Sequence, residues 1–232
     1  IDTLLEGFAQ PANGPLLPHV WAYDSTLAVP KYNAEQAAHL LRQDGWRDSD
    51  GDGVVEKDGK TFVFSIKTNA GNQLRRDVAV MIQAQLRKVG VKAAIETVEW
   101  NQFIEQVFDR KDFDAVILAW DADFTVDPSP LWHSKAIENG YNFVSYHNPR
   151  VDSLLEAGRH TSDRHAAKAI WAEFQKIIVD DAPYTFLFIP DQLAGINKRV
   201  RDVKMDARGF LSSVSSWWIP RELRKTEVAR SR

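Results

Sequence analysis

Residues 112–130 read Asp-Phe-Asp-Ala-Val-Ile-Leu-Ala-Trp-Asp-Ala-Asp-Phe-Thr-Val-Asp-Pro-Ser-Pro. The run from Phe113 to Trp120 is almost wholly apolar, is bounded by polar residues and is too short for a typical helix. It predicts a strand buried on both faces of a mostly parallel sheet. Three carboxylates follow it: Asp121, Asp123 and Asp127. Ligands of open α/β sheets bind beyond the carboxyl ends of the strands. Trp120 and these acids therefore indicate a binding site for a cation, such as an amino group.

The segments before this strand alternate between strand and helix patterns. Thr61–Thr68 and Val91–Val98 predict strands. Apolar residues at helical spacing predict helices over Gln73–Val89 and Trp100–Arg110. With the strand at 113–120, the order β-α-β-α-β predicts an α/β fold with a mostly parallel or mixed sheet flanked by helices.

Further elements are expected on both sides of this unit. Capping residues predict helix starts at Asn33, at Asp127-Pro128 and at Asn148-Pro149. Helical spacing predicts a helix over Ser162–Asp180. The remaining predicted elements are strands at Pro183–Ile189 and Gln192–Ile196.

Composition excludes several classes of protein. The chain has 232 residues, 44% of them hydrophobic, and a net charge of −3 with basic residues interspersed among acids, so we expect no nucleic-acid partner. It has no cysteine, which excludes disulfides, thiolate zinc sites and cysteine nucleophiles. No apolar run approaches the ~20 residues of a transmembrane helix. The chain begins at Ile1 without a signal peptide, and we expect it to be a piece of a longer precursor.

An acidic turn, Asp48-Ser49-Asp50-Gly51-Asp52-Gly53, matches the start of an EF-hand calcium loop. The match then fails, because the twelfth position is Gly59 where a bidentate Glu is required, although Glu56 offers a partial substitute. The candidate calcium ligands are Asp48, Asp50, Asp52 and Glu56. The alternative is a tight turn that leads into a hairpin with Lys57-Asp58-Gly59-Lys60 at its tip.

Other candidate sites have competing structural explanations. Trp120 is either a cation–π partner of a ligand amine or ordinary packing. His133 with Asp121 and Asp123 matches no established metal-ligand spacing. A hydrolase based on these acids is a possible alternative function, but no nucleophile elbow, His-Glu-x-x-His helix or phosphate-binding loop accompanies them.

Six segments carry a family resemblance, in this order: Ala37–Glu56, Thr68–Asn72, Gln85–Val91, Phe113–Asp123, Asn142–Tyr146 and Ala182–Tyr184. On these segments the chain resembles the C-terminal half of the peptide/nickel-type (family 5) periplasmic substrate-binding proteins of ABC importers. The resemblance extends through nearly the whole chain, and six segments in the family's order make it specific.

The resemblance implies one lobe of a bilobed, type II periplasmic-binding-protein-like fold that closes on a second lobe around the ligand. Residues 33–200 would form the α/β ligand-binding lobe, residues 1–32 a strap from a missing N-terminal lobe, and residues 201–232 a return segment with a frayed basic tail. It also implies a periplasmic location, or anchoring outside the membrane of a single-membrane bacterium. The ligand would be delivered to ABC transporter permease subunits, with neither catalysis nor a cofactor.

In peptide-binding members, an Asp after a strand-terminal Trp-x-Ala pairs with the peptide α-ammonium, and here that role falls on Asp123. The ligand-binding residues that the resemblance implies are Asp123, Trp120, Asp121, Ala122 and Phe124. Non-peptide members often lack this Asp, so its presence favours short peptides over a nickel chelate, haem, an opine or a sugar. Asp121 departs from the family, where a neutral residue is more usual, and could widen the preference to cations in general.

Overall fold

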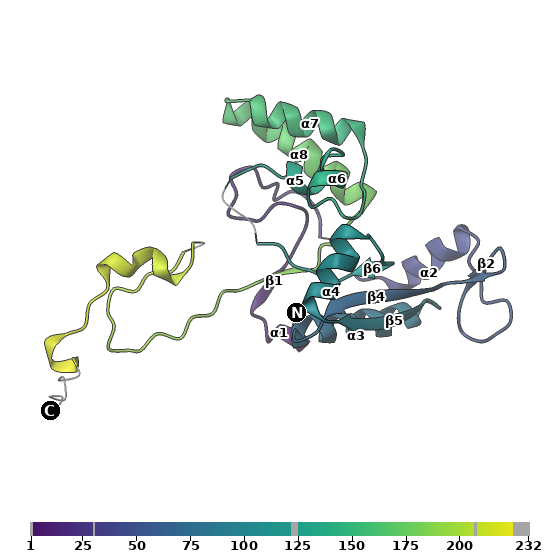
Figure 1. Cartoon of the computed structure of the whole chain (residues 1–232), viewed down its shortest axis with the longest axis horizontal. Coiled ribbons are helices and arrows are strands. Elements are labelled where there is room, and N and C mark those ends of the chain that lie inside the picture. The colour runs from purple at the N-terminus through teal and green to yellow at the C-terminus, as the bar shows by residue number, and fades with distance from the viewer. Residues whose placement is uncertain (1, 30, 122–124, 207, 225–232) are drawn as a thin grey trace.

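The centre of the fold is a parallel sheet of three strands in the order β5-β4-β6 (Figure 1). The computed structural model describes residues 2–29, 31–121, 125–206 and 208–224. The strands are β4 (Val63–Asn69), β5 (Lys92–Val98) and β6 (Ala115–Val116). β4 pairs in parallel with β5 from Val63↔Lys92 to Asn69↔Val98, and with β6 at Ile66↔Ala115 and Lys67↔Val116. The predicted β-α-β-α-β order and parallel sheet are confirmed.

The strand predicted at 113–120 is shorter and less buried than its apolar sequence suggested. β6 lies at the edge of the sheet, and one further backbone hydrogen bond, from Ile117 N–H to Lys67 O at 3.0 Å, extends its pairing. Ala115 and Val116 are only half-buried. The expectation of a strand buried on both faces in the sheet interior was wrong, because β4 takes the central position and leaves β6 with one neighbour.

The two faces of the sheet are covered by different helices. Helix α3 (Gln73–Arg87) packs Val78 and Ala79 against Ile66 of β4. On the other face, α4 (Trp100–Ile104) continues into a π-helix, η1 (Glu105–Asp109), whose Val107 is fully buried. The predicted helix over Trp100–Arg110 is therefore present but changes its hydrogen-bonding pattern halfway.

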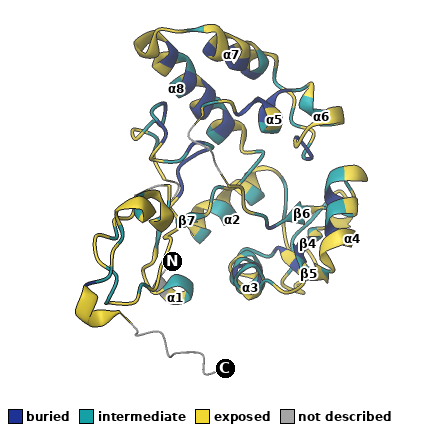
Figure 2. Cartoon of the chain, turned by 60° about the vertical axis from the view of Figure 1, so that its left-hand side comes forward, coloured by how far each residue is buried: buried dark blue, intermediate teal, exposed yellow. Residues whose placement is uncertain are grey.

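A second body is built from two longer helices that pack side by side, α7 (Pro149–His160) and α8 (Arg164–Asp181). Figure 2 shows their buried residues on the faces they turn toward each other and toward the rest of the chain. The short helices α5 (Ser129–Trp132) and α6 (Ala136–Asn139) precede them. The core of this body consists of Leu16, Val20, Ala22, Trp132, Val151, Leu154, Leu155, Ala167, Trp171, Phe174 and Ile178.

The N-terminal segment is built into this helical body. Leu16, Val20 and Ala22 belong to its core, and the fully buried Gln175 donates to Ala22 O at 3.0 Å while accepting the Asp24 N–H at 3.2 Å. The segment also supplies α1 (Asp2–Leu5) and β1 (Ala9–Pro11), which pairs antiparallel with β7 (Phe188–Pro190). The division of the chain at residues 32 and 200 stays a prediction.

Local capping signals predicted the starts of two helices correctly. Asn33 Oδ1 accepts the Gln36 N–H at 2.9 Å at the start of α2 (Ala34–Gln43). Asn148 accepts the Arg150 N–H at 3.0 Å at the start of α7. These side chains satisfy backbone donors that have no partner inside the helix.

The predicted hairpin is also confirmed. β2 (Glu56–Lys57) and β3 (Lys60–Thr61) pair antiparallel, with Lys57 opposite Lys60. The turn residues Asp58 and Gly59 both have positive φ, 53° and 72°, as the tightest hairpin turns require.

The two strands expected near the C-terminus are largely absent. Only Phe188–Pro190 is a strand, and residues 192–196 form none. β7 pairs with β1 over three residues only. The chain beyond Pro190 extends away from both bodies (Figure 1). This extended part contains the 3₁₀ helices η2 (Phe210–Ser216) and η3 (Arg221–Leu223). Among the described residues, no helix combines the length and apolarity needed to cross a membrane.

Replacing Gly158 by alanine should destabilise the α7–α8 pair. A Cβ on Gly158 would overlap the fully buried indole of Trp171, with 2.7 Å to its Cε2. We expect a loss of about 1–3 kcal/mol in the free energy of unfolding, measured by urea denaturation. Gly195→Ala, where a Cβ meets nothing within 4 Å, is the control. Equal stability of the two variants would contradict this packing.

Lys67→Met should also destabilise the fold. Lys67 is 3% exposed, and its Nζ donates to Gln106 Oε1 at 2.8 Å and to Asp112 O at 2.7 Å. Methionine fills similar volume but leaves both acceptors unpaired, so we expect a loss of about 2–4 kcal/mol in the same measurement. Lys92→Met, at an exposed position on the neighbouring strand, should change stability by less than about 0.5 kcal/mol. Similar losses in both variants would refute the role of Lys67.

Candidate functional site

Trp120 lies four residues beyond β6, in a cluster of aromatic rings. Its ring centroid is 6.1 Å from Phe108 of η1, 5.6 Å from Tyr141 and 6.3 Å from Phe143. Phe143 is buried, whereas Trp120 is 36% exposed. The predicted site therefore has a packed aromatic floor at the carboxyl end of the parallel strands, with Trp120 partly open to solvent.

Three of the predicted ligand residues, Ala122, Asp123 and Phe124, lie outside the described residues. Asp121 is described and is exposed. The role of Asp123 as the anchor of a ligand amino group stays a prediction.

Asp127 has a structural role, as its sequence suggested. Its Oδ1 accepts the Ser129 N–H at 3.2 Å at the start of α5, and its Oδ2 is 3.5 Å from Arg159 Nε of α7. The helix begins one residue later than predicted, with Pro128 at the capping position. Asp127 thus positions the segment that leaves the candidate site.

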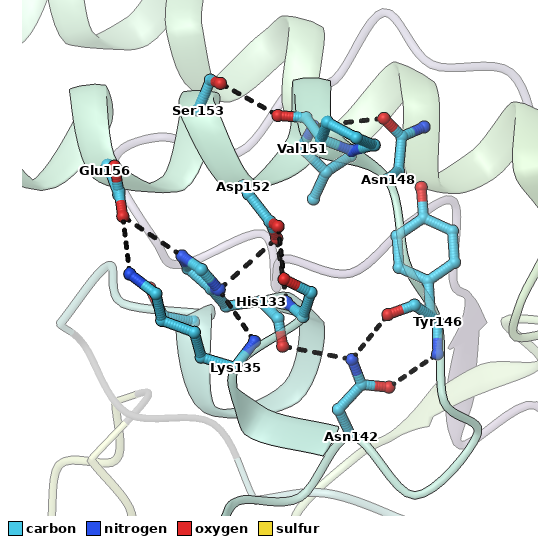
Figure 3. Close-up of polar contacts among 12 residues, drawn as sticks. His133, Lys135, Asn142, Tyr146, Asn148, Val151, Asp152, Ser153 and Glu156 are labelled. Carbon is cyan, nitrogen blue, oxygen red and sulfur yellow. Dashed lines mark hydrogen bonds and ion pairs between the residues drawn. The ribbon is translucent and has the colours of Figure 1, made fainter. Parts of the chain in front are cut away.

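The segment after α5 is held on α7 by a hydrogen-bond network (Figure 3). Ser134 donates both its N–H, at 2.8 Å, and its Oγ–H, at 2.5 Å, to the carboxylate of Asp152. The fully buried Asn142 donates to His133 O at 3.2 Å and to Tyr146 O at 2.9 Å, and accepts the Tyr146 N–H at 2.9 Å. These bonds fix the backbone on both sides of Tyr141.

His133 belongs to this network. Its Nδ1 accepts the Lys135 N–H at 3.1 Å and lies 3.4 Å from Asp152 Oδ1, while its Nε2 is 3.4 Å from Glu156 Oε1. The imidazole is buried between two carboxylates that project from α7. Both ring nitrogens therefore contact α7 or the adjacent backbone. These contacts give His133 a structural role.

Two tyrosines to which the sequence assigned no role contact this part of the structure: the Tyr146 N–H donates to Asn142, and the Tyr184 ring lies 5.8 Å from that of Phe143. Burial raises the pKa of Tyr184, an effect that the neighbouring indole of Trp120 partly offsets. Burial and the neighbouring Asp181 raise the pKa of Tyr146, whose hydroxyl donates to Asp181 Oδ2 at 2.5 Å. Each tyrosine is the last residue of a family segment, Asn142–Tyr146 or Ala182–Tyr184, and this was the available signal for them.

The four acids of the turn at 48–56 come together. One carboxylate oxygen from each of Asp48, Asp50, Asp52 and Glu56 lies within 4.8 Å of the others, the only such group in the described part of the chain. Local hydrogen bonds account for the arrangement: Asp48 accepts the N–H groups of Gly51 and Gly53, and Glu56 accepts from Ser49. Calcium binding at this turn stays a prediction.

Comparison with known proteins supports a binding site rather than a catalytic one. Residues 1–142 match the family model described as bacterial extracellular solute-binding proteins, family 5 Middle. The chain is 34% identical over 222 residues to the oligopeptide-binding protein AppA of Bacillus subtilis (strain 168), a match that covers 94% of this chain and 41% of AppA.

Solved structures of bilobed type II binding proteins show the same fold. The structure of AppA in complex with a nonapeptide matches with a TM-score of 0.84, over 94% of this chain and 44% of that chain. NikZ from Campylobacter jejuni, in complex with Ni(L-His), is 27% identical and matches with a TM-score of 0.80, over 93% of this chain and 45% of that chain. The chain thus spans less than half the length of these relatives.

These matches confirm the family resemblance and the fold class that the sequence predicted. They also confirm the expectation of a protein that is not an enzyme, because the family consists of solute-binding proteins. With more than half of its length matched by the family model, the chain belongs to the bacterial extracellular solute-binding proteins of family 5.

Proposed function

We propose that this chain is a ligand-binding lobe of the extracytoplasmic component of an ABC importer, and that its ligands are di- or oligopeptides. The observation that carries the proposal is the similarity to AppA, solved with a nonapeptide, over 94% of the chain. Trp120 follows β6 on the carboxyl side of the parallel strands. Parallel α/β sheets bind ligands at this end.

In the proposed mechanism, the Asp123 carboxylate pairs with the ammonium group at the peptide N-terminus. The neighbouring residues Trp120, Asp121, Ala122 and Phe124 surround that end of the peptide. A charge-assisted hydrogen bond of this kind strengthens as water is excluded, provided that further hydrogen bonds offset the desolvation of both charges. Closure of a second lobe over the site supplies that environment.

The exposed apolar residues of the C-terminal segment are consistent with a second lobe. Between residues 191 and 224, the exposed side chains include Leu193, Met205, Phe210, Leu211, Val214, Trp218 and Leu223. An exposed apolar surface of this kind indicates a segment that another part of a protein covers. In the proposed protein, residues 1–32 and 201–232 connect this lobe with the other one. The protein works in the periplasm, or anchored outside a single membrane, and delivers its ligand to the permease subunits.

A non-peptide ligand is the second candidate, favoured by one observation. NikZ, solved with Ni(L-His), has a similar structure over nearly the whole chain. The ligand in that structure contains a single amino acid bound to nickel, so an amino-acid unit is common to both kinds of ligand. The two candidates therefore differ in ligand and share the same lobe and site.

Native mass spectrometry of the complete protein, purified from its host, separates the two candidates. We expect a heterogeneous set of bound masses that correspond to short peptides, because a protein that holds the peptide backbone and N-terminus tolerates many side chains. A single bound mass that corresponds to a metal complex would overturn the peptide proposal.

Asp123→Asn in the complete protein should weaken peptide binding by about 1.5–3 kcal/mol, because the charged partner of the peptide ammonium is lost. Isothermal titration calorimetry measures the change. Asp58→Asn, at the exposed hairpin tip, is the control and should leave affinity unchanged. A larger loss for Asp121→Asn than for Asp123→Asn would show that Asp121, and not Asp123, is the anchor.

A further inference from the structure

Trp120, which precedes the proposed ligand anchor by three residues in the sequence, forms an exposed aromatic pair with Tyr141. Their ring centroids are 5.6 Å apart and their planes meet at 64°, an edge-to-face arrangement. Tyr141 is 55% exposed and Trp120 is 36% exposed. We infer that this pair, the aromatic wall, receives an apolar side chain of the bound peptide, and that Tyr141 determines side-chain preference. The inference rests on the proposed function and goes beyond it by naming the surface that selects among peptides.

The exposure of both rings distinguishes this pair from the other aromatic contacts. In every other ring pair of the described residues, at least one partner is buried or half-buried, as with Trp100 on the fully buried Phe103. Single exposed apolar residues are common on protein surfaces, whereas adjoining ones indicate a binding surface. The aromatic wall is therefore the part of the aromatic cluster that remains available to a ligand.

The wall is supported from below by packed rings. Phe108 lies edge-on to both members, 6.1 Å from Trp120 and 6.2 Å from Tyr141. Phe108 in turn packs against the buried Phe143 at 4.9 Å. The rings of the wall therefore rest on a core that leaves little room for them to turn inward.

The backbone of Tyr141 is equally constrained. Its N–H donates to Pro130 O at 2.9 Å, and its neighbour Asn142 is buried with three hydrogen bonds. A tyrosine on a fixed backbone has only two side-chain torsions left to order on binding, so its conformational-entropy cost is small. The aromatic wall is thus preorganised for contact with a ligand.

The chemistry and the position of the wall identify its occupant. Its rings offer apolar faces for an aromatic or aliphatic side chain. Trp120 immediately precedes the segment that contains the proposed anchor, so a peptide held by its N-terminus at Asp123 places its first side chains near this surface. The exposed carboxylate of Asp121 disfavours an acidic side chain there.

The inference is tested by calorimetry on the complete protein with Tyr141→Ala. The ligands are an alanine peptide of the length that the wild type binds and the same peptide with phenylalanine at each position in turn. We expect the phenylalanine peptide that the wild type prefers to lose about tenfold in affinity, and the alanine peptide to change by less than about twofold. Tyr141→Phe should retain the preference, because the ring supplies the contact.

Tyr32→Ala is the matched control. Tyr32 is 62% exposed and contacts Lys88 rather than the aromatic cluster, so its loss should leave every affinity unchanged. Unchanged affinity for the alanine peptide also reports that Tyr141→Ala leaves the site folded.

Two results would overturn the inference, and they are distinguishable. If the wild type binds peptides but Tyr141→Ala weakens all of them equally or none of them, the aromatic wall does not select side chains, and the proposed function stands. If the wild type binds none of the peptides and instead holds a metal complex, the proposed function fails and the inference fails with it.

Discussion

The buried ammonium group of Lys67 holds together the parts of the fold that carry the site. It lies in the central strand β4 and bonds to Gln106 of the π-helix and to the backbone of Asp112, where the chain enters β6. Its third neighbour is Glu96 of β5, at 3.6 Å. A buried cation needs such partners to offset its desolvation. The Lys67 side chain therefore links β4, the π-helix and the chain that enters β6. Phe108 follows Gln106 by two residues and Trp120 follows Asp112 by eight, so both of these contacting rings lie close in sequence to the partners of Lys67.

The aromatic cluster joins the sheet to the helical body. Phe143 contacts Phe108 and Phe113 on the side of the sheet, and Tyr184 contacts both Phe143 and Trp132, which belongs to the helical core. The hydrogen bonds of Asp152 and Asn142 hold the intervening segment on α7. The surface formed by Trp120 and Tyr141 is therefore assembled from distant parts of the chain and supported by both bodies.

Local signals predicted local structure well and strand pairing less well. The helix starts at Asn33 and Asn148 and the hairpin tip at Asp58-Gly59 are confirmed, because a cap or a turn depends on a few neighbouring residues. The strands predicted at 113–120, 183–189 and 192–196 were overestimated. An apolar run forms a strand only where a partner strand lies beside it. The pairing of β6 with β4 and of β7 with β1 involves residues remote in sequence.

The sequence alone determined the fold class, the order of the central β-α-β-α-β unit and the family, because hydrophobic periodicity, capping residues and six ordered segments are all visible along the chain. It also marked Trp120 and the acids that follow. Only the tertiary structure decided that β4 is the central strand, that His133 is engaged by α7, and that Tyr141 and Phe108 stand beside Trp120. These contacts join residues from different elements, and their proximity depends on how the sheet and the helices pack, which no local pattern encodes.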